Sequence, residues 1–138
     1  MVIEWGHMVT GHVGGTAGVD VREVRRFVRE ALDTEGGAFD LDDIDLMTVE
    51  IATNAARHSA SGRKDGGVRV TVLWTPDLAR VEIQDDGDSE TLPQMSHSDE
   101  WGESGRGLLL VNELAHAWGV RVGDDERRRV TVWFEAKG

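Results

Sequence analysis

The sequence predicts an α+β fold, a two-layer sandwich in which a mostly antiparallel sheet is covered on one face by helices. The first observation is the order of the segments. Two helical segments precede two strand segments, and a third helical segment precedes two more strands. The second observation is that a turn joins the strands of each pair, as in a β-hairpin. The third is that each helical segment has one apolar stripe, which a sheet can cover.

The first two helices are predicted from their apolar periodicity and their capping residues. Residues 20–32 place apolar side chains on one side and arginines on the other, and Asp20 with Glu23 has the spacing of a capping box. A pair of glycines separates this helix from the next one. Residues 41–59 follow Asp40, whose carboxylate can cap the second helix.

The rest of the chain alternates strands with one helix and one long connection. Alternating apolar residues predict strands at residues 68–75, 80–85, 120–122 and 130–135. A third helix is expected at 105–118. The connection at 86–104 has little periodicity, and a connection of this length is typical of a lid over a ligand. Residues 1–18 form either a flexible segment or, at 8–13, an edge strand, so that residues 19–138 make up a single domain.

The composition excludes several functional classes. The chain has 138 residues, of which 39% are hydrophobic, enough for the core of one domain. A net charge of −11 without a basic stripe argues against direct nucleic-acid binding, because clustered lysine and arginine recognise a phosphate backbone. The lack of cysteine excludes disulfides, thiolate metal sites and a cysteine nucleophile. No apolar run has the length of a membrane span, so we expect a cytoplasmic protein without a membrane partner.

The segment MTVEIATNAARHS, residues 47–59, carries the first candidate site. Glu50, Asn54 and Arg57 follow one another about one helical turn apart, beside the apolar stripe. A carboxylate can accept a proton, an asparagine oxygen can bind Mg²⁺, and a guanidinium can pair with phosphate oxygens. The same residues also fit an ordinary solvated helix face. His58 lies at the border of the apolar stripe and also fits a hydrogen-bonded core histidine.

The segment VEIQDDGDS, residues 81–89, carries the second candidate site. Because Val81 and Ile83 share one face of the strand, Asp85 points inward with them. A buried carboxylate needs a partner, and the exocyclic amine of adenine would satisfy it. Gly87 would let a flat ring approach the backbone. An ordinary acidic turn is the alternative interpretation.

The segment GESGRGLLLV, residues 102–111, carries the third candidate site. Its glycines precede an apolar helix, so backbone amides at Gly105 and Gly107 can converge on an anion, and Arg106 can add a charge-assisted contact. Leu108 begins the apolar face of that helix. A glycine-rich loop that only starts a helix fits the same residues. The segment is neither a phosphate loop ending in Gly-Lys-Ser/Thr nor a dinucleotide fingerprint, which must follow a strand.

The order of these motifs resembles a known superfamily. A Glu-x-x-x-Asn helix, an Asp-x-Gly strand end, a loose lid and a Gly-x-Gly-Leu helix resemble the N, G1 and G2 boxes of the gyrase, chaperone, histidine-kinase and mismatch-repair (GHKL) ATPases. The likeness is closest to the single-domain actinobacterial anti-sigma factor serine kinases, through EIATNAARHS, ESGRGLLLV, LAHAWGVR and VTVWFE. It covers about residues 20–136 and implies that residues 19–138 are one histidine-kinase-like ATPase domain with a Bergerat-type fold.

The resemblance also implies roles for individual residues. Glu50 matches the N-box glutamate, which acts as general base, and Asn54 matches the asparagine that coordinates Mg²⁺. Asp85 matches the family's adenine-binding aspartate, and the glycines of the third motif match those whose amides hold the phosphates. The full set of residues expected to contact the nucleotide, besides Glu50, is Asn54, Arg57, His58, Asp85, Gly87, Gly105, Arg106, Gly107 and Leu108.

The implied activity is that of an ATP- and Mg²⁺-dependent protein-serine kinase. Such a protein phosphorylates an anti-anti-sigma partner of the STAS type and binds a sigma factor when that partner is absent; the resemblance also implies a homodimer. Two positions depart from the family pattern: Ser89 replaces the usual second G1 glycine, and Arg128-Arg129 replaces a glycine with a small or basic neighbour. These departures leave an alternative, a catalytically inactive or weak nucleotide-binding module that acts by sequestering another protein.

Overall fold

The strands form one antiparallel sheet. The computed structural model describes residues 3–33, 38–87 and 102–138. In this part of the chain, five strands pair antiparallel in the order β1-β2-β3-β5-β4. The elements, in chain order, are β1 His7–Gly14, α1 Val21–Asp33, α2 Leu41–His58, the short 3₁₀ helix η1 Ala60–Gly62, β2 Gly67–Trp74, β3 Leu78–Gln84, α3 Gly102–Leu114, β4 Ala117–Val122 and β5 Val130–Lys137.

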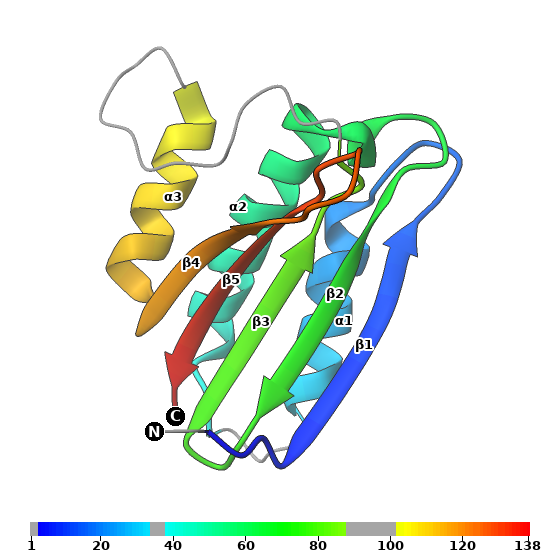
Figure 1. The fold of residues 1–138 in the computed structure, drawn as a ribbon. Coiled ribbons are helices and arrows are strands. Elements are labelled where there is room, and N and C mark those ends of the chain that lie inside the picture. The colour runs from blue at the N-terminus through cyan, green and yellow to red at the C-terminus, as the bar shows by residue number, and fades with distance from the viewer. Residues whose placement is uncertain (1–2, 34–37, 88–101) are drawn as a thin grey trace.

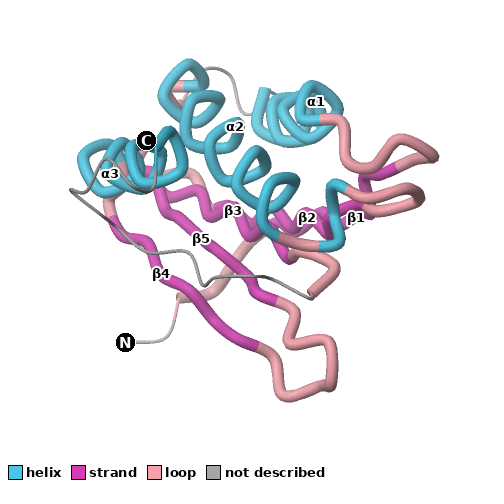
Figure 2. The backbone as a smooth tube through the Cα atoms, turned by 90° about the horizontal axis from the view of Figure 1, so that it is seen from above, coloured by secondary structure: helices cyan, strands magenta, loops and turns pink. Residues whose placement is uncertain are grey.

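The helices and the sheet form two layers. Helices α1, α2 and α3 all lie on one face of the sheet, while the opposite face has no helix in the described part of the chain (Figures 1 and 2). Helix α2 lies between the other two and packs against both. The predicted α+β sandwich is therefore confirmed. In this arrangement the C-terminal ends of α2 and β3 lie at the same end of the molecule (Figure 1).

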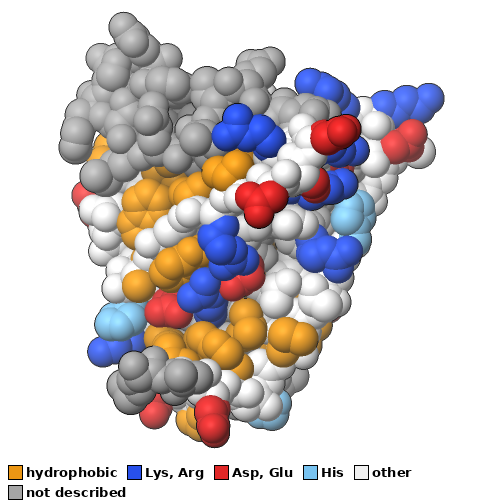
Figure 3. Space-filling view, in the orientation of Figure 1, with side chains coloured by type: hydrophobic (Ala, Val, Ile, Leu, Met, Phe, Trp, Pro, Cys, Tyr) orange, Lys and Arg blue, Asp and Glu red, His pale blue; other side chains and the backbone are white. Residues whose placement is uncertain are grey.

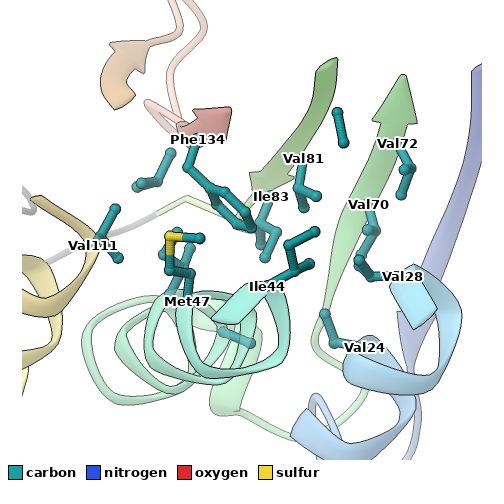
Figure 4. Packing of buried hydrophobic residues seen from close by; sticks show 14 of the residues in the cluster. Val24, Val28, Ile44, Met47, Val70, Val72, Val81, Ile83, Val111 and Phe134 are labelled. Carbon is teal, nitrogen blue, oxygen red and sulfur yellow. The ribbon is translucent and has the colours of Figure 1, made fainter. Parts of the chain in front are cut away.

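Apolar side chains between the two layers form one core (Figure 4). On α2, Ile44, Met47 and Ile51 are at most 2% exposed, which confirms the predicted apolar stripe of this helix. Because these side chains fix the helix against the sheet, its neighbouring polar stripe keeps one orientation. Other buried members of the cluster are Val24, Val28, Val70, Val72, Val81, Ile83, Val111 and Phe134.

Asp20 caps the N-terminus of α1, as its position in the sequence predicts. The Asp20 carboxylate accepts a hydrogen bond of 2.9 Å from the backbone N–H of Arg22, which lowers the pKa of Asp20. The Glu23 carboxylate accepts a charge-assisted hydrogen bond from Arg26. The capping role predicted for Asp20 is therefore confirmed.

The third helix ends earlier than predicted. The sequence predicts a helix at 105–118, whereas α3 ends before the chain turns into β4. Trp118 is paired with Phe134 of β5, and the backbone N–H of His116 donates to the carbonyl of Glu135 at 2.7 Å. The pairing with β5 satisfies the backbone of this segment, so tertiary context overrides its helical periodicity.

The remaining predicted helices and strands agree with the structure to within three residues at each end, the largest difference being the start of β4. The segment for which the sequence left open a flexible chain or an edge strand contains β1, which pairs with β2 from His7 opposite Trp74 to Gly14 opposite Gly67. At its first pair, the rings of His7 and Trp74 are stacked with centroids 5.0 Å apart. β1 is thus the edge strand next to β2.

Charged side chains gather in the middle of the open face of the sheet (Figure 3). Arg80 donates to Glu82 at 2.8 Å and to Glu135 at 3.1 Å, and Arg121 donates to Glu82 at 3.1 Å. The Arg80 guanidinium also lies 3.9 Å from the ring centroid of Trp133. This network compensates its charges across β3, β5 and β4 and ties the three strands together.

The network predicts acid sensitivity. Burial acts to raise the pKa of Glu82, but hydrogen bonds from Arg121 and Arg80 outweigh it and hold the pKa below its ordinary value of 4.5. A lowered pKa adds stability above the unfolded pKa, and this stability is lost as the pH falls through the folded value. We therefore expect the free energy of unfolding to fall below about pH 4.5, and to fall less steeply in Glu82→Gln.

Urea denaturation between pH 7 and pH 3 measures this slope. The matched control is Glu113→Gln, which makes the same chemical change at an exposed position of α3 and should follow the wild-type curve. Parallel curves for Glu82→Gln and the wild type would show that Glu82 does not contribute to the acid transition.

Candidate functional site

Helix α2 carries the polar residues of the first motif. Asp40 caps the helix, as predicted. Its carboxylate accepts hydrogen bonds from the backbone N–H groups of Asp42 and Asp43, at 3.1 Å each. Asn54 is buried, with 8% of its surface exposed, whereas Glu50 is half-buried and Arg57 is exposed. A buried carboxamide distinguishes this edge from an ordinary solvated helix face. His58 is half-buried at the end of the helix, a position that fits either role left open by the sequence.

Asp85 lies buried directly after β3. Its neighbours Val81 and Ile83 are 1% and 2% exposed and Asp85 is 6% exposed, so the inward orientation predicted from alternation is confirmed. One carboxylate oxygen, Oδ1, accepts hydrogen bonds from the backbone N–H groups of Gly87 at 2.8 Å and Val130 at 3.0 Å. The hydrogen bond from Gly87, two residues on, is that of an Asx-turn, so the acidic-turn interpretation also fits, although the carboxylate is buried. The carboxylate is held in one orientation by backbone donors from the segment after β3 and from the first residue of β5.

Gly87 has a second reason to be glycine that the sequence did not reveal. Its φ is +87°, a left-handed conformation that favours glycine. A Cβ at this position would also lie 2.4 Å from the carbonyl oxygen of Arg127, in the turn between β4 and β5. Arg128 follows with φ +52°, and its N–H donates to the Asp125 carboxylate at 2.8 Å. The turn that departs from the family pattern therefore packs directly against the second motif.

The structure joins the first two motifs through a junction. We call Ala60, Ser61, Asp86 and Gly87 the α2–β3 junction. The N–H of Ala60 donates to the carbonyl of Gly87 at 2.9 Å, and the N–H of Asp86 donates to the Ser61 hydroxyl at 2.9 Å. The segment that follows the Asn54 helix is thus hydrogen-bonded to the two residues that follow Asp85.

A polar hollow of about 420 Å³ borders the end of β3. Asp85 and Asp86 contribute to its wall, and Arg69 and Arg129 add positive charge. Its lining residues His12, Arg69 and Gln84 are cross-strand neighbours that point away from the core, so the hollow lies on the open face of the sheet and not on the core side to which Asp85 points.

The third motif is described only in part. Leu108 is 2% exposed, in agreement with its predicted place on the apolar face of α3. The helix begins at Gly102, three residues before the predicted start, so Gly105 and Gly107 lie within its first turns. The side chain of Arg106 and the surroundings of the two glycines lie outside what the structure describes, as does most of the predicted lid, including Ser89. Their contacts with phosphate stay predictions.

The described residues fit a Mg²⁺ ion held mainly by its phosphate ligand, rather than a metal ion held by several protein side chains. Among the described residues, no three acidic or histidine side chains are grouped as a metal site would require. Asn54 supplies a neutral oxygen, which suits a Mg²⁺ ion whose other ligands are phosphate oxygens and water.

No described helix has the length and apolar character needed to cross a membrane.

Comparisons with known proteins identify the family. The model of the histidine kinase-like ATPase domain matches residues 16–134. The catalytic domain of the histidine kinase ThkA, in a nucleotide-free form, superposes with a TM-score of 0.51 and 16% identity, covering 85% of this chain and 88% of that one. The mycobacterial sensor histidine kinase MprB gives a TM-score of 0.49 and 16% identity, covering 87% and 97%.

At this identity the structural matches concern the fold alone, and no curated protein matches the chain. The family model, in contrast, spans nearly the whole chain, including both motifs joined by the α2–β3 junction. The chain therefore belongs to the histidine kinase-like ATPase domain family.

Proposed function

We propose that this protein binds Mg-ATP and transfers the γ-phosphate to a serine of an anti-anti-sigma partner of the STAS type. The observation that supports the proposal is the α2–β3 junction, whose hydrogen bonds connect the segment after the Asn54 helix to the residues that follow the buried Asp85. Membership in the family supports ATP binding and, in general, ATP-dependent phosphotransfer. The serine specificity and the partner come from the resemblance of the motifs to anti-sigma kinases.

Each of the two motifs suits one part of the nucleotide. Asp85 offers a carboxylate to the exocyclic amine of adenine, and its orientation is fixed by Gly87 and Val130. Asn54 and Arg57 offer an oxygen ligand and a positive charge at the phosphate end. When bound, Mg²⁺ would neutralise charge on the phosphates. Positioning and charge neutralisation are what phosphoryl transfer mainly requires of a protein.

Glu50 is the residue that we propose as proton acceptor. It is half-buried, one helical turn before Asn54 on the same stripe of α2. A carboxylate in this position can accept the proton of the attacking serine hydroxyl as the new bond to phosphorus forms. The proposed partners are this STAS-type protein and a sigma factor, which the protein would sequester when the STAS-type protein is absent. A homodimer, which sedimentation of the protein would detect, is part of the same proposal.

A second candidate function is a nucleotide-binding regulatory module that does no chemistry. The observation that favours it is the contact of Arg127 with Gly87, because the turn with the unusual Arg128-Arg129 sequence closes against the adenine end. Such a protein would bind ATP and act through protein contacts alone.

Thermal unfolding with Mg-ATP and Mg-ADP tests nucleotide binding. Ligand at about 100 times its dissociation constant should stabilise the native state by roughly 2.7 kcal/mol, which raises Tm by several degrees. Incubation with labelled ATP and a purified STAS-type protein then separates the two candidates. Labelled phosphate on a serine supports the kinase, whereas a thermal shift without transfer or ADP formation supports the regulatory module. No shift at millimolar ATP would contradict both.

A further inference from the structure

Two residues of the α2–β3 junction have no role in the motifs described above. The Ser61 hydroxyl, which is fully buried, accepts a hydrogen bond from the N–H of Asp86 at 2.9 Å. The Asp86 carboxylate in turn accepts one from the N–H of Gly67, the first residue of β2, at 2.8 Å. Asp86 therefore links the segment after α2, the end of β3 and the start of β2. Its side chain points away from Asp85, as expected for the next residue in an extended chain.

The segment after α2, to which Asp86 is hydrogen-bonded, is itself closely packed. The Ser61 N–H donates to the Ser59 hydroxyl at 3.1 Å, and the Ser61 carbonyl accepts from Val19 at 2.9 Å. A Cβ at Gly62 would lie 1.9 Å from the carbonyl oxygen of Ala56, inside α2. The residues after the helix are thus packed against its last turns, so a displacement of Ser61 would displace the end of α2 with it.

We propose that Ser61 and Asp86 are positioning residues that fix the separation between the adenine end and the phosphate end of the nucleotide site. This inference rests on the proposed function, because it concerns the same site. Neither residue needs to contact the nucleotide. The Ser61 hydroxyl holds the backbone of Asp86 to the segment after α2, and the Asp86 carboxylate holds the same backbone to the start of β2.

The consequence depends on the length of the ligand. ATP reaches from one end of the site to the other, so it gains affinity when the two ends are held at the correct separation. Adenosine occupies the adenine end alone and gains nothing from that separation. A loosened junction should therefore weaken ATP binding selectively, whereas damage to the adenine end should weaken both ligands equally.

The experiment measures the dissociation constants of Mg-ATP and adenosine by calorimetry for Asp86→Ala and Ser61→Ala. Ser61→Ala removes the acceptor of the Asp86 N–H, and we expect it to lower ATP affinity about tenfold. Asp86→Ala keeps that N–H and releases only Gly67, so its loss of ATP affinity should be smaller. Adenosine affinity should change by less than about twofold in both variants. The matched control is Asp77→Ala, which removes an exposed carboxylate from the β2–β3 turn at the opposite end of the sheet and should leave both affinities unchanged. Ligand-free unfolding curves verify that each variant is folded.

A conservative variant separates positioning from general destabilisation. Asp86→Asn keeps an oxygen that can accept from Gly67, and it loses only the negative charge facing His12, whose Nε2 lies 4.0 Å from Asp86 Oδ1. We expect it to retain ATP affinity within about threefold of the wild type. Should Asp86→Ala not fold, Ser61→Ala and Asp86→Asn still give the comparison.

Equal losses for ATP and adenosine, or unchanged ATP affinity in both alanine variants, would overturn the inference while the proposed function stands. An asparagine variant as weak as the alanine variant would also contradict it, since the backbone hydrogen bond would then not be the cause. A wild-type protein that binds neither ligand would instead contradict the proposed function itself.

Discussion

Asp85→Asn is expected to weaken Mg-ATP binding by about 100-fold or more, with little change in the stability of the ligand-free protein. An asparagine oxygen can still accept the hydrogen bonds that Oδ1 receives from Gly87 and Val130, so the local structure should persist. The carboxamide nitrogen, however, replaces an acceptor by a donor. A donor that faces the exocyclic amine of adenine leaves both groups unpaired, which costs more than a lost hydrogen bond alone.

Calorimetric titration with ATP and with inosine triphosphate checks this prediction. Inosine carries a carbonyl oxygen in place of the amine, so the asparagine variant should lose most of the preference for ATP. Asp77→Asn makes the same change in an exposed turn and should behave as the wild type. An Asp85→Asn protein that keeps its affinity and its preference for ATP would show that this carboxylate does not read the base.

The inward orientation of Asp85 could be predicted because it depends on local periodicity alone. Val81, Ile83 and Asp85 share one face of β3, and strand alternation decides that face without knowledge of the partner strands. The same is true of the apolar stripe of α2. The end of α3 could not be predicted in this way, since Trp118 satisfies a helical period but is paired with Phe134 of β5. Where a distant strand supplies the backbone partners, local pattern is insufficient.

The sequence predicts the segments of the candidate site separately, but it does not predict the contacts that join the first two motifs. The hydrogen bond between Ser61 and Asp86 joins residues 25 positions apart, and no periodic pattern in either segment indicates it. The outward orientation of Asp86 was the available signal, because an acid beside a buried strand end often accepts backbone hydrogen bonds. The sequence explains Gly87 by the approach of a flat ring to the backbone. The structure adds a second reason, because a Cβ at this position would collide with the carbonyl oxygen of Arg127.

Glu50→Gln is expected to leave ATP binding unchanged and to lower phosphate transfer by about 10²–10⁴-fold, the usual contribution of a general base. Glutamine keeps the size of the side chain and its hydrogen-bonding oxygen on the half-buried edge of α2. It cannot accept the proton of the serine hydroxyl, which must leave as the bond to phosphorus forms. The measurement is the single-turnover rate of labelled phosphate transfer from bound ATP to the STAS-type protein, with ATP affinity determined in parallel.

The control for this change is Glu113→Gln, an exposed glutamate of α3 outside the proposed site, which should transfer phosphate at the wild-type rate. The combination of unchanged affinity and lost transfer is informative because the roles proposed for Asp85 and Glu50 belong to different steps: Asp85 would recognise the base, and Glu50 would accept a proton. If Glu50→Gln transferred phosphate normally, the proton would have another acceptor. If the wild type and the variant were equally inactive while both bound ATP, the chain would hold nucleotide for regulation, and the half-buried Glu50 would have no chemical role.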